Sequence, residues 1–402
     1  MSLSAFESLQ ARTATGRGAG NPTTKRFQRA PSPLNGERAE VRGEDATCCP
    51  QQKSASTAKP RCHFALTARS VLAAFLALAP ALASSSETTA STPTNSTSVL
   101  VVVGAAGEEE FGQTFAESAG RWSNACREAS AKLTTIGVGT NGAASDLERL
   151  QQALTNEPKD GAAELWLVLL GHGTFNGKEA KFNLRGADVS ATELADWLKP
   201  FRRPLAVINT SSASAPFLAK LTGTNRVILT ATRSGNEVNY ARLGRFLSEA
   251  IADPEADLDK DGQTSLLEAF LSASRRTADY YSTEGRLATE HALLDDNGDG
   301  LGTPPDWFRG VRAVKRAKAG AMLDGLRAHQ FHLVRRGGDL ALSPSTRARR
   351  DELELSIAHL RELKGSLAEE EYYSQLEALL LELARLYEGS GTKPPTPKPQ
   401  YE

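Results

Sequence analysis

The sequence has few cysteines, no long apolar run and almost no net charge. Only four cysteines occur, none spaced as Cys-x-x-Cys, which excludes a disulfide-rich scaffold and a cysteine-based zinc module. No apolar stretch reaches the roughly 18 residues that a membrane span requires. Because 47 Lys and Arg face 48 Asp and Glu, the chain has no basic field for nucleic acid. We therefore expect no transmembrane span in the mature chain and no nucleic-acid partner.

The charge is nevertheless unevenly distributed along the chain. Residues 1–83 hold 11 Lys and Arg against 5 Asp and Glu, whereas the remainder is acidic. Residues 70–83 form an apolar stretch that ends in Ala-Leu-Ala and follows a basic flank. This arrangement is typical of a secretory signal peptide cleaved after Ala83. The alternative, a short buried helix, is disfavoured by the polar linker at 84–97.

The predicted cleavage has consequences for location and for cysteine chemistry. The first ~60 residues lack periodicity and are predicted to be a disordered leader. Export would place the mature protein in the periplasm or outside the cell. Cleavage would remove Cys48, Cys49 and Cys62, leaving Cys126 alone, so no internal disulfide is expected.

Apolar runs alternate with amphipathic stretches in the mature chain. Buried strands are predicted at Ser98–Val103, Leu133–Val138, Glu164–Leu170, Pro204–Asn209 and Arg226–Ala231. Helices are predicted between them, at Phe111–Lys132, Ser145–Leu154, Ala191–Leu198 and Ala215–Leu221. Nearly continuous apolar strands separated by helices indicate a parallel sheet covered on both faces. We predict an α/β fold with a doubly wound, mostly parallel sheet over 98–330.

The C-terminal part of the chain has a different composition. Residues 345–388 form two highly charged helical runs interrupted near Gly365, which predicts a helical hairpin of coiled-coil character, packed on itself or on the main domain. Residues 389–402 are a Pro-rich tail without a core. This region is also compatible with a scaffold role in the cell envelope.

Polar residues follow two consecutive strands of the predicted sheet. The third strand is followed by His172-Gly173, and the fourth by Thr210-Ser211-Ser212. In an open parallel sheet, sites form outside the carboxyl ends of the strands. One crossover helix separates the two segments, so we expect His172 and Ser211 to meet on neighbouring strand ends.

This arrangement resembles the caspase and legumain group of cysteine peptidases, with the legumain branch the closer match. The resemblance covers roughly residues 98–250. It implies a caspase-like fold, with His172 as general base and then acid, and with the backbone N–H groups of Gly173 and Ser211 in the oxyanion pocket. The nucleophile position, however, holds Ser211 where the group has cysteine.

The exchange of serine for cysteine leaves three interpretations open. A thiol is partly ionised and a histidine dyad suffices to activate it, whereas a serine hydroxyl needs a base oriented by a carboxylate. The chain is then a catalytically impaired homologue that binds peptides or proteins, a working Ser–His peptidase, or a protein similar in fold only. In the last case, the serines form a hydroxyl-rich turn with Ser214 capping the next helix.

The loop after the fifth strand contains Arg233 and Glu237. By the same resemblance it borders a specificity pocket, which makes these two residues candidate substrate-binding groups. A solvated pair of opposite charges is the alternative.

A second kind of site is indicated by residues 257–268. The sequence DLDKDGQTSLLE matches the EF-hand pattern D-x-D-x-D-G-x5-E at every position. Helices are expected on both sides, at Leu243–Ala252 and Leu266–Tyr281. The pattern predicts a structural Ca²⁺ ion, with these ligands: Asp257, Asp259, Asp261, the carbonyl of Gln263, and Glu268.

A weaker copy of the pattern follows at 295–300. Asp295, Asn297 and Asp299 occupy the first, third and fifth positions, and Asp306 the twelfth. Asp is shorter than Glu, and two prolines precede Asp306, so a calcium site and a plain turn remain alternatives. His291, just upstream, is predicted to be structural rather than a metal ligand.

Overall fold

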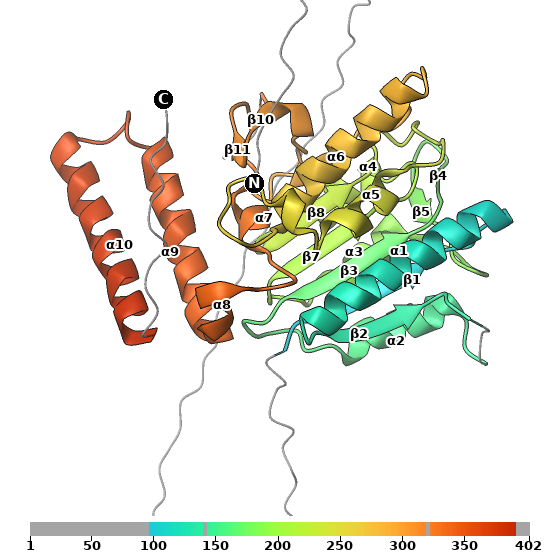
Figure 1. Cartoon of the computed structure of the whole chain (residues 1–402), viewed down its shortest axis with the longest axis horizontal. Helices are drawn as coiled ribbons and strands as arrows, with labels where there is room; N and C mark the ends of the chain where they lie inside the picture. Colours follow the sequence, from blue (N-terminus) through green and yellow to red (C-terminus); the bar gives the residue numbers. More distant parts are fainter. Residues whose placement is uncertain (1–95, 140–142, 319–321, 391–402) are drawn as a thin grey trace, which may run out of the picture. The chain divides into compact units, whose positions relative to one another are not determined.

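A computed structural model describes residues 96–139, 143–318 and 322–390. The predicted leader and signal peptide lie outside these residues. Of the predicted linker at 84–97 only the last two residues are described, and of the Pro-rich tail only the first two. The chain has a mixed α/β architecture whose central sheet is mostly parallel (Figure 1). No helix within the described part of the chain combines the length and apolarity needed to span a membrane.

The central sheet has six strands in the order β2-β1-β3-β7-β8-β9. All neighbouring strands are parallel except β8 and β9, which are antiparallel. The strands are β1 (Ser98–Val103), β2 (Lys132–Ile136), β3 (Leu165–Leu170), β7 (Leu205–Asn209), β8 (Arg226–Thr230) and β9 (Leu293–Asp295). The five predicted strands are confirmed to within two residues at each end, and β9 is an addition that the sequence pattern did not reveal.

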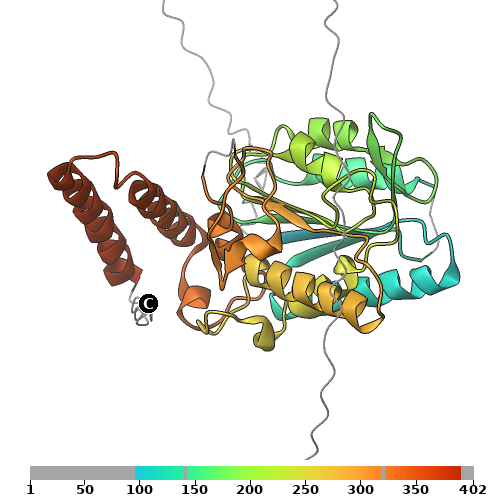
Figure 2. The same cartoon turned by 90° about the horizontal axis from the view of Figure 1, so that it is seen from above.

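Two hydrophobic cores cover the faces of this sheet, because alternate side chains of each buried strand point to opposite sides. On β3, Trp166 and Val168 belong to one core, and Leu167 and Leu169 to the other. Figure 2 shows the helices as layers above and below the strands. The first core contains residues of α1 (Glu109–Glu128), α5 (Leu243–Ala250) and α6 (Leu266–Thr283); the second contains residues of α2 (Asp146–Asn156), α3 (Ala191–Leu198) and α4 (Ala215–Leu221).

Local interactions set the ends of several helices. Ser145 and Ser190 each accept a hydrogen bond from the third helical N–H, and the glutamate there bonds back, so α2 and α3 begin at capping boxes. The predicted helix Phe111–Lys132 begins two residues earlier and ends at Glu128. It stops there because Ser130 adopts a left-handed φ of 53° and the chain enters β2 at Lys132.

Shorter strands and helices lie outside the central sheet and its two helical layers. A three-stranded antiparallel sheet follows β3, and its strands are β4 (Gly173–Phe175), β5 (Ala180–Phe182) and β6 (Val189–Ser190). The remaining short elements are η1 (Pro254–Ala256), η2 (Pro305–Trp307), β10 (Phe308–Arg309), β11 (Arg312–Ala313), α7 (Leu326–Gln330) and α8 (Gly337–Ala341).

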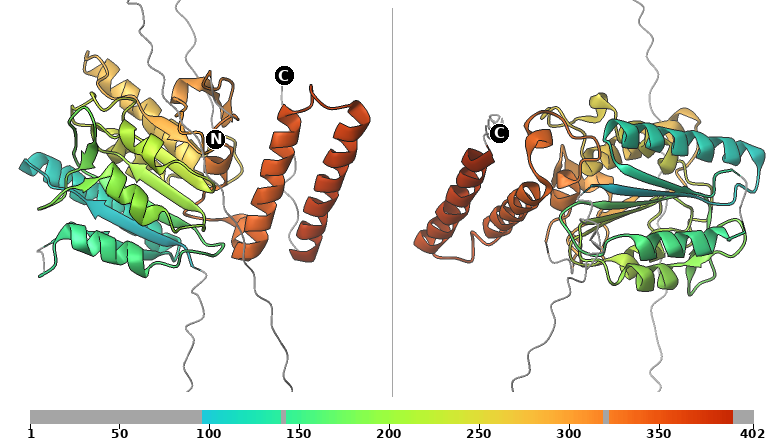
Figure 3. Two further views of the ribbon diagram at one scale, coloured as in Figure 1. Left: turned by 180° about the vertical axis from the view of Figure 1, so that it is seen from behind. Right: turned by 90° about the horizontal axis from the view of Figure 1, so that it is seen from below.

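Two long helices end the described chain, α9 (Pro344–Glu362) and α10 (Glu369–Ser390). They pack against each other (Figure 3). An ion pair between Arg349 and Glu382 connects them. Leu353 and Ile357 are buried, whereas Leu380 on α10 is 45% exposed.

Candidate functional site

The carboxyl ends of β3 and β7 lie side by side. Leu169 is opposite Asn209 in a parallel register, so the segments that follow emerge at the same edge of the sheet. Gly173 lies directly against the serines, since a Cβ on it would stand 2.7 Å from Oγ of Ser211. The structure therefore brings the two segments together, although the side chains of His172 and Ser211 bond to other groups.

The imidazole of His172 is half-buried among aromatic rings. It meets Phe111 and Phe115 edge to face at centroid distances of 4.9 and 5.3 Å, and Tyr240 lies beside it. Its Nε2 is 3.1 Å from the carbonyl oxygen of Ala106. A carbonyl only accepts, so Nε2 carries the proton and Nδ1 is the basic nitrogen. The group that orients this imidazole is thus a backbone carbonyl and not a carboxylate.

Ser211 is completely buried, and its hydrogen bonds are internal. Its hydroxyl donates to Oδ1 of Asn209 at 2.7 Å, and its backbone N–H donates to the same oxygen at 3.1 Å. Asn209 is also completely buried. To act as nucleophile and oxyanion donor, the hydroxyl and the N–H of Ser211 would both have to break their hydrogen bonds to Asn209.

The second expected oxyanion donor is engaged as well. The N–H of Gly173 donates to Oγ of Ser212 at 3.1 Å, and that hydroxyl donates back to the carbonyl of Gly173. Ser214 occupies the N-cap position of α4 without capping it, contrary to the alternative considered for the serines. Its Oγ instead accepts from the N–H groups of Ala231 and Thr232, because they lie at the end of the neighbouring strand β8.

The loop after β8 completes this edge of the sheet. The N–H of Ala213 donates to the carbonyl of Glu237 at 2.8 Å, which fixes the loop to the serines. The carboxylate of Glu237 lies 2.7 Å from Nδ1 of His291 and 3.4 Å from Nε of Arg233. Arg233 is 61% exposed at its side chain, whereas Glu237 is 15% exposed. Arg233 is therefore the group of this pair that an incoming molecule meets.

The loop at 257–268 gathers its carboxylates around one point. Oxygens of Asp257, Asp259 and Asp261 lie within 4.8 Å of one another. Asp257 accepts from the N–H groups of Lys260 and Gly262, at 2.6 and 3.0 Å. Burial, with further carboxylates nearby, raises the pKa of Asp261. A divalent cation bound here would offset that cost.

Glu268 closes the loop from its twelfth position. One of its carboxylate oxygens accepts from the N–H groups of Leu258 and Asp259, at 2.8 and 3.3 Å. The other accepts from the backbone and hydroxyl of Ser265, both at 2.8 Å, as part of the capping box that begins α6. The carboxylate is fully buried and held in place from both sides.

The segment at 295–300 repeats the hydrogen bonds of the first loop position by position. Asp295 accepts from the N–H groups of Gly298 and Gly300, at 3.1 and 3.2 Å. Oδ1 of Asn297 accepts from the backbone N–H of Asp299 at 2.9 Å. In the first loop, Oδ1 of Asp259 accepts from the backbone N–H of Asp261 at 3.1 Å. The two segments therefore share one backbone conformation around their first, third and fifth side chains.

The twelfth position of this second loop is replaced by a residue outside the pattern. Asp306, the expected residue, lies in η2. Asp324 instead accepts from the N–H groups of Asp296 and Asn297, at 3.0 and 3.2 Å, and from the hydroxyl of Thr303. These groups correspond to those that Glu268 accepts from in the first loop. Burial, together with the charge of Asp296, raises the pKa of Asp324 to about 8.

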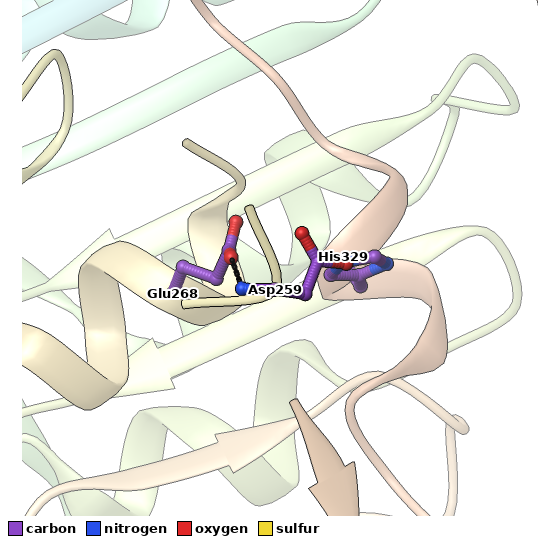
Figure 4. A group of neighbouring side chains, drawn as sticks. All are labelled: Asp259, Glu268 and His329. Atoms are coloured by element: carbon purple, nitrogen blue, oxygen red, sulfur yellow. Dashed lines mark hydrogen bonds and ion pairs between the residues drawn. The ribbon is translucent and has the colours of Figure 1, made fainter. Parts of the chain in front are cut away.

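A histidine from α7 also approaches the first loop. Nε2 of His329 lies 3.3 Å from Oδ2 of Asp259. Figure 4 shows His329 beside Asp259 and Glu268, three residues whose ligand atoms lie within 4.8 Å of one another. Neither Asp324 nor His329 belongs to a local pattern, so the sequence carried no signal for them.

No protein-family model and no curated protein matches this chain. Among solved structures, the crystal structure of the Drosophila initiator caspase Dronc is similar with a TM-score of 0.34 and 13% identity. That similarity covers 52% of this chain and 82% of the Dronc chain. A similarity of this strength carries no argument about activity, and the α/β architecture rests on the sheet topology described above.

Proposed function

We propose that this protein is an exported caspase/legumain-like homologue that binds peptides or proteins at the carboxyl edge of its sheet without cleaving them. The observation that carries the proposal is Ser211, which is fully buried and donates its hydroxyl to Asn209 at 2.7 Å. The base of a serine enzyme would also need a carboxylate behind it, and His172 has a backbone carbonyl.

The neighbouring loop supplies a group that suits recognition. Arg233 is exposed beside the strand ends, and its planar guanidinium can pair with a carboxylate in two parallel hydrogen bonds. Acidic side chains or a C-terminal carboxylate of a partner are therefore the chemistry that this edge favours.

Binding and cleavage are separable in one experiment. An acidic peptide library is incubated with the wild type and with the Ser211→Ala, Arg233→Ala and Arg202→Ala variants. Arg202, 83% exposed, is the matched control, because it precedes β7 and so lies at the amino ends of the parallel strands, whereas Arg233 follows the carboxyl end of β8. We expect unchanged binding in Ser211→Ala and Arg202→Ala, at least fivefold weaker binding in Arg233→Ala, and no cleavage products by mass spectrometry.

The alternative, an active Ser–His peptidase, makes the opposite prediction. Cleavage by the wild type that is lost in His172→Ala and raised in Ser211→Cys would replace the binding proposal with that one.

Export has its own test, since a mature chain isolated from the envelope or the medium should begin at Ser84.

We further propose that the two acidic loops bind Ca²⁺ as structural ions. The support is the convergence of Asp257, Asp259 and Asp261, and the matching hydrogen bonds around Asp295 with Asp324 in place of the glutamate. Outside the cell, calcium is abundant enough to fill even weak loops. A bound ion would stabilise the region between β8 and α7 by mass action.

Chelation tests the calcium proposal. Removing Ca²⁺ should lower the melting temperature of the wild type by several degrees. Asp259→Ala should lose most of that response, whereas Asp196→Ala, on the distant helix α3, should keep it. A melting curve of the wild type that chelator leaves unchanged would contradict the proposal.

A further inference from the structure

One buried nitrogen beside the first loop faces carboxylates. Nε2 of His329 is shielded from solvent and lies 3.3 Å from Oδ2 of Asp259, at ion-pair distance but without the geometry of a regular hydrogen bond among the described residues. Buried polar atoms normally have well-formed hydrogen bonds, so a nitrogen that faces carboxylates without one is a candidate ligand atom. A species bound there must accept electron pairs from nitrogen and oxygen together, which is the property of a metal ion.

The spacing of the three donors suits a small divalent ion. Around tetrahedral Zn²⁺, with bonds of about 2.0–2.1 Å, neighbouring ligand atoms are separated by about 3.3 Å. The nitrogen of His329 and the oxygen of Asp259 already have that separation. The third donor, on Glu268, lies within 4.8 Å of both, so a shift of at most about 1.5 Å would complete the set.

The chemistry of the donors distinguishes this ion from calcium. Ca²⁺ takes six to eight oxygen ligands at about 2.3–2.6 Å, and imidazole is not among them. Imidazole with carboxylates is instead a donor set for Zn²⁺ and related transition metals. A calcium loop alone therefore leaves the placement of His329 unexplained.

The surroundings hold the donors in position. Asp296 accepts from the N–H groups of Gly325 and Ala328 at 2.8 and 2.7 Å, which fixes the start of α7 and hence His329. Ser265 orients the carboxylate of Glu268 from the other side. Such outer hydrogen bonds are typical of metal ligands, because they reduce the reorganisation needed on binding.

We propose that His329, Asp259 and Glu268 form a site for Zn²⁺ that overlaps the first calcium loop. The site rests on the same loop as the calcium proposal and deepens it: His329 adds a nitrogen ligand that lets the loop bind a transition metal as well as Ca²⁺. An ion pair between a protonated His329 and Asp259 is the competing explanation, and it needs no metal.

The test compares the two metals on the full chain. Protein stripped with chelator is titrated separately with Zn²⁺ and Ca²⁺ by calorimetry, in the wild type and in the His329→Ala, His329→Gln and His359→Ala variants. His359, an exposed histidine on α9, is the matched control. We expect His329→Ala to weaken zinc binding at least tenfold and to change calcium binding less than threefold, with His359→Ala unchanged.

Spectroscopy identifies the ligand directly. Co²⁺ bound to the wild type should show the intense visible bands of a tetrahedral site with a nitrogen ligand, and His329→Gln should lose them. Zinc affinity that is the same in the wild type and in both His329 variants, or no zinc binding by the wild type, would overturn the proposal. Zinc binding that depends on His329 without calcium binding would instead refute the calcium proposal alone.

Discussion

Gly137 is a position where the fold admits only glycine. It directly follows β2 with φ of 88°, and a Cβ there would stand 1.8 Å from the carbonyl oxygen of Val103. Gly139 has a similar φ of 75°, but among the described residues no atom lies within 4 Å of its Cβ position. A side chain at Gly137 would therefore clash with Val103 and also strain the left-handed backbone. At Gly139 it would only strain the backbone.

This pair makes a matched mutational test. Gly137→Ala should lower the free energy of unfolding by about 3 kcal/mol or more, because the backbone of β1 must shift. Gly139→Ala should cost only about 1–2 kcal/mol, the ordinary penalty of alanine in the left-handed region. Urea denaturation of both variants measures the difference. Equal losses would show that the contact with Val103 relaxes freely.

The candidate sites were predictable at residue level only where their chemistry is local. The positions of Asp257, Asp259 and Asp261 follow from spacing, since turns within twelve residues bring them together. Asp324 and His329 come from other parts of the fold, and only tertiary packing delivers them to the loops. The contact between Ser211 and Asn209 is local, yet no pattern distinguishes it from a serine facing a crevice.

At the level of elements, the strands were predictable because a strand buried on both faces must be apolar throughout. The runs at Ser98–Val103 and Leu165–Leu170 are fully buried, as their composition indicates. Elements of two or three residues escaped prediction because they are too short to show a period. The antiparallel strand Leu293–Asp295 is one of these; its pairing with β8 places Asp295, and with it the second loop, at the edge of the sheet.

Across the whole molecule, a buried network of charges connects the sheet to the C-terminal helices. Glu164, directly before β3, pairs with Arg335, which lies 3.4 Å from Asp339 in α8. Asp339 also pairs with Arg350 in α9. Breaking a buried pair leaves a charge uncompensated, so the network couples the attachment of α9 to the state of each carboxylate.

Asp351 makes this attachment sensitive to pH. It accepts from Arg350 at 2.7 Å, but burial raises its pKa to about 6, from about 3.8 in the unfolded chain. The folded state therefore binds the proton of Asp351 more tightly than the unfolded chain does. Protonation of Asp351 stabilises the fold fully below about pH 4, and this stabilisation is lost as the pH rises towards 6.

Asp351→Asn, which is uncharged at every pH, isolates this contribution. Relative to that variant, the wild type should lose stability between about pH 4 and pH 6, by at most about 3 kcal/mol for a shift of two pKa units. Denaturant unfolding of both proteins across this range gives the difference between the curves. Parallel curves would mean that Arg350 keeps the carboxylate ionised in the folded protein, and a wild type that gains stability with rising pH would reverse the assigned direction of the shift.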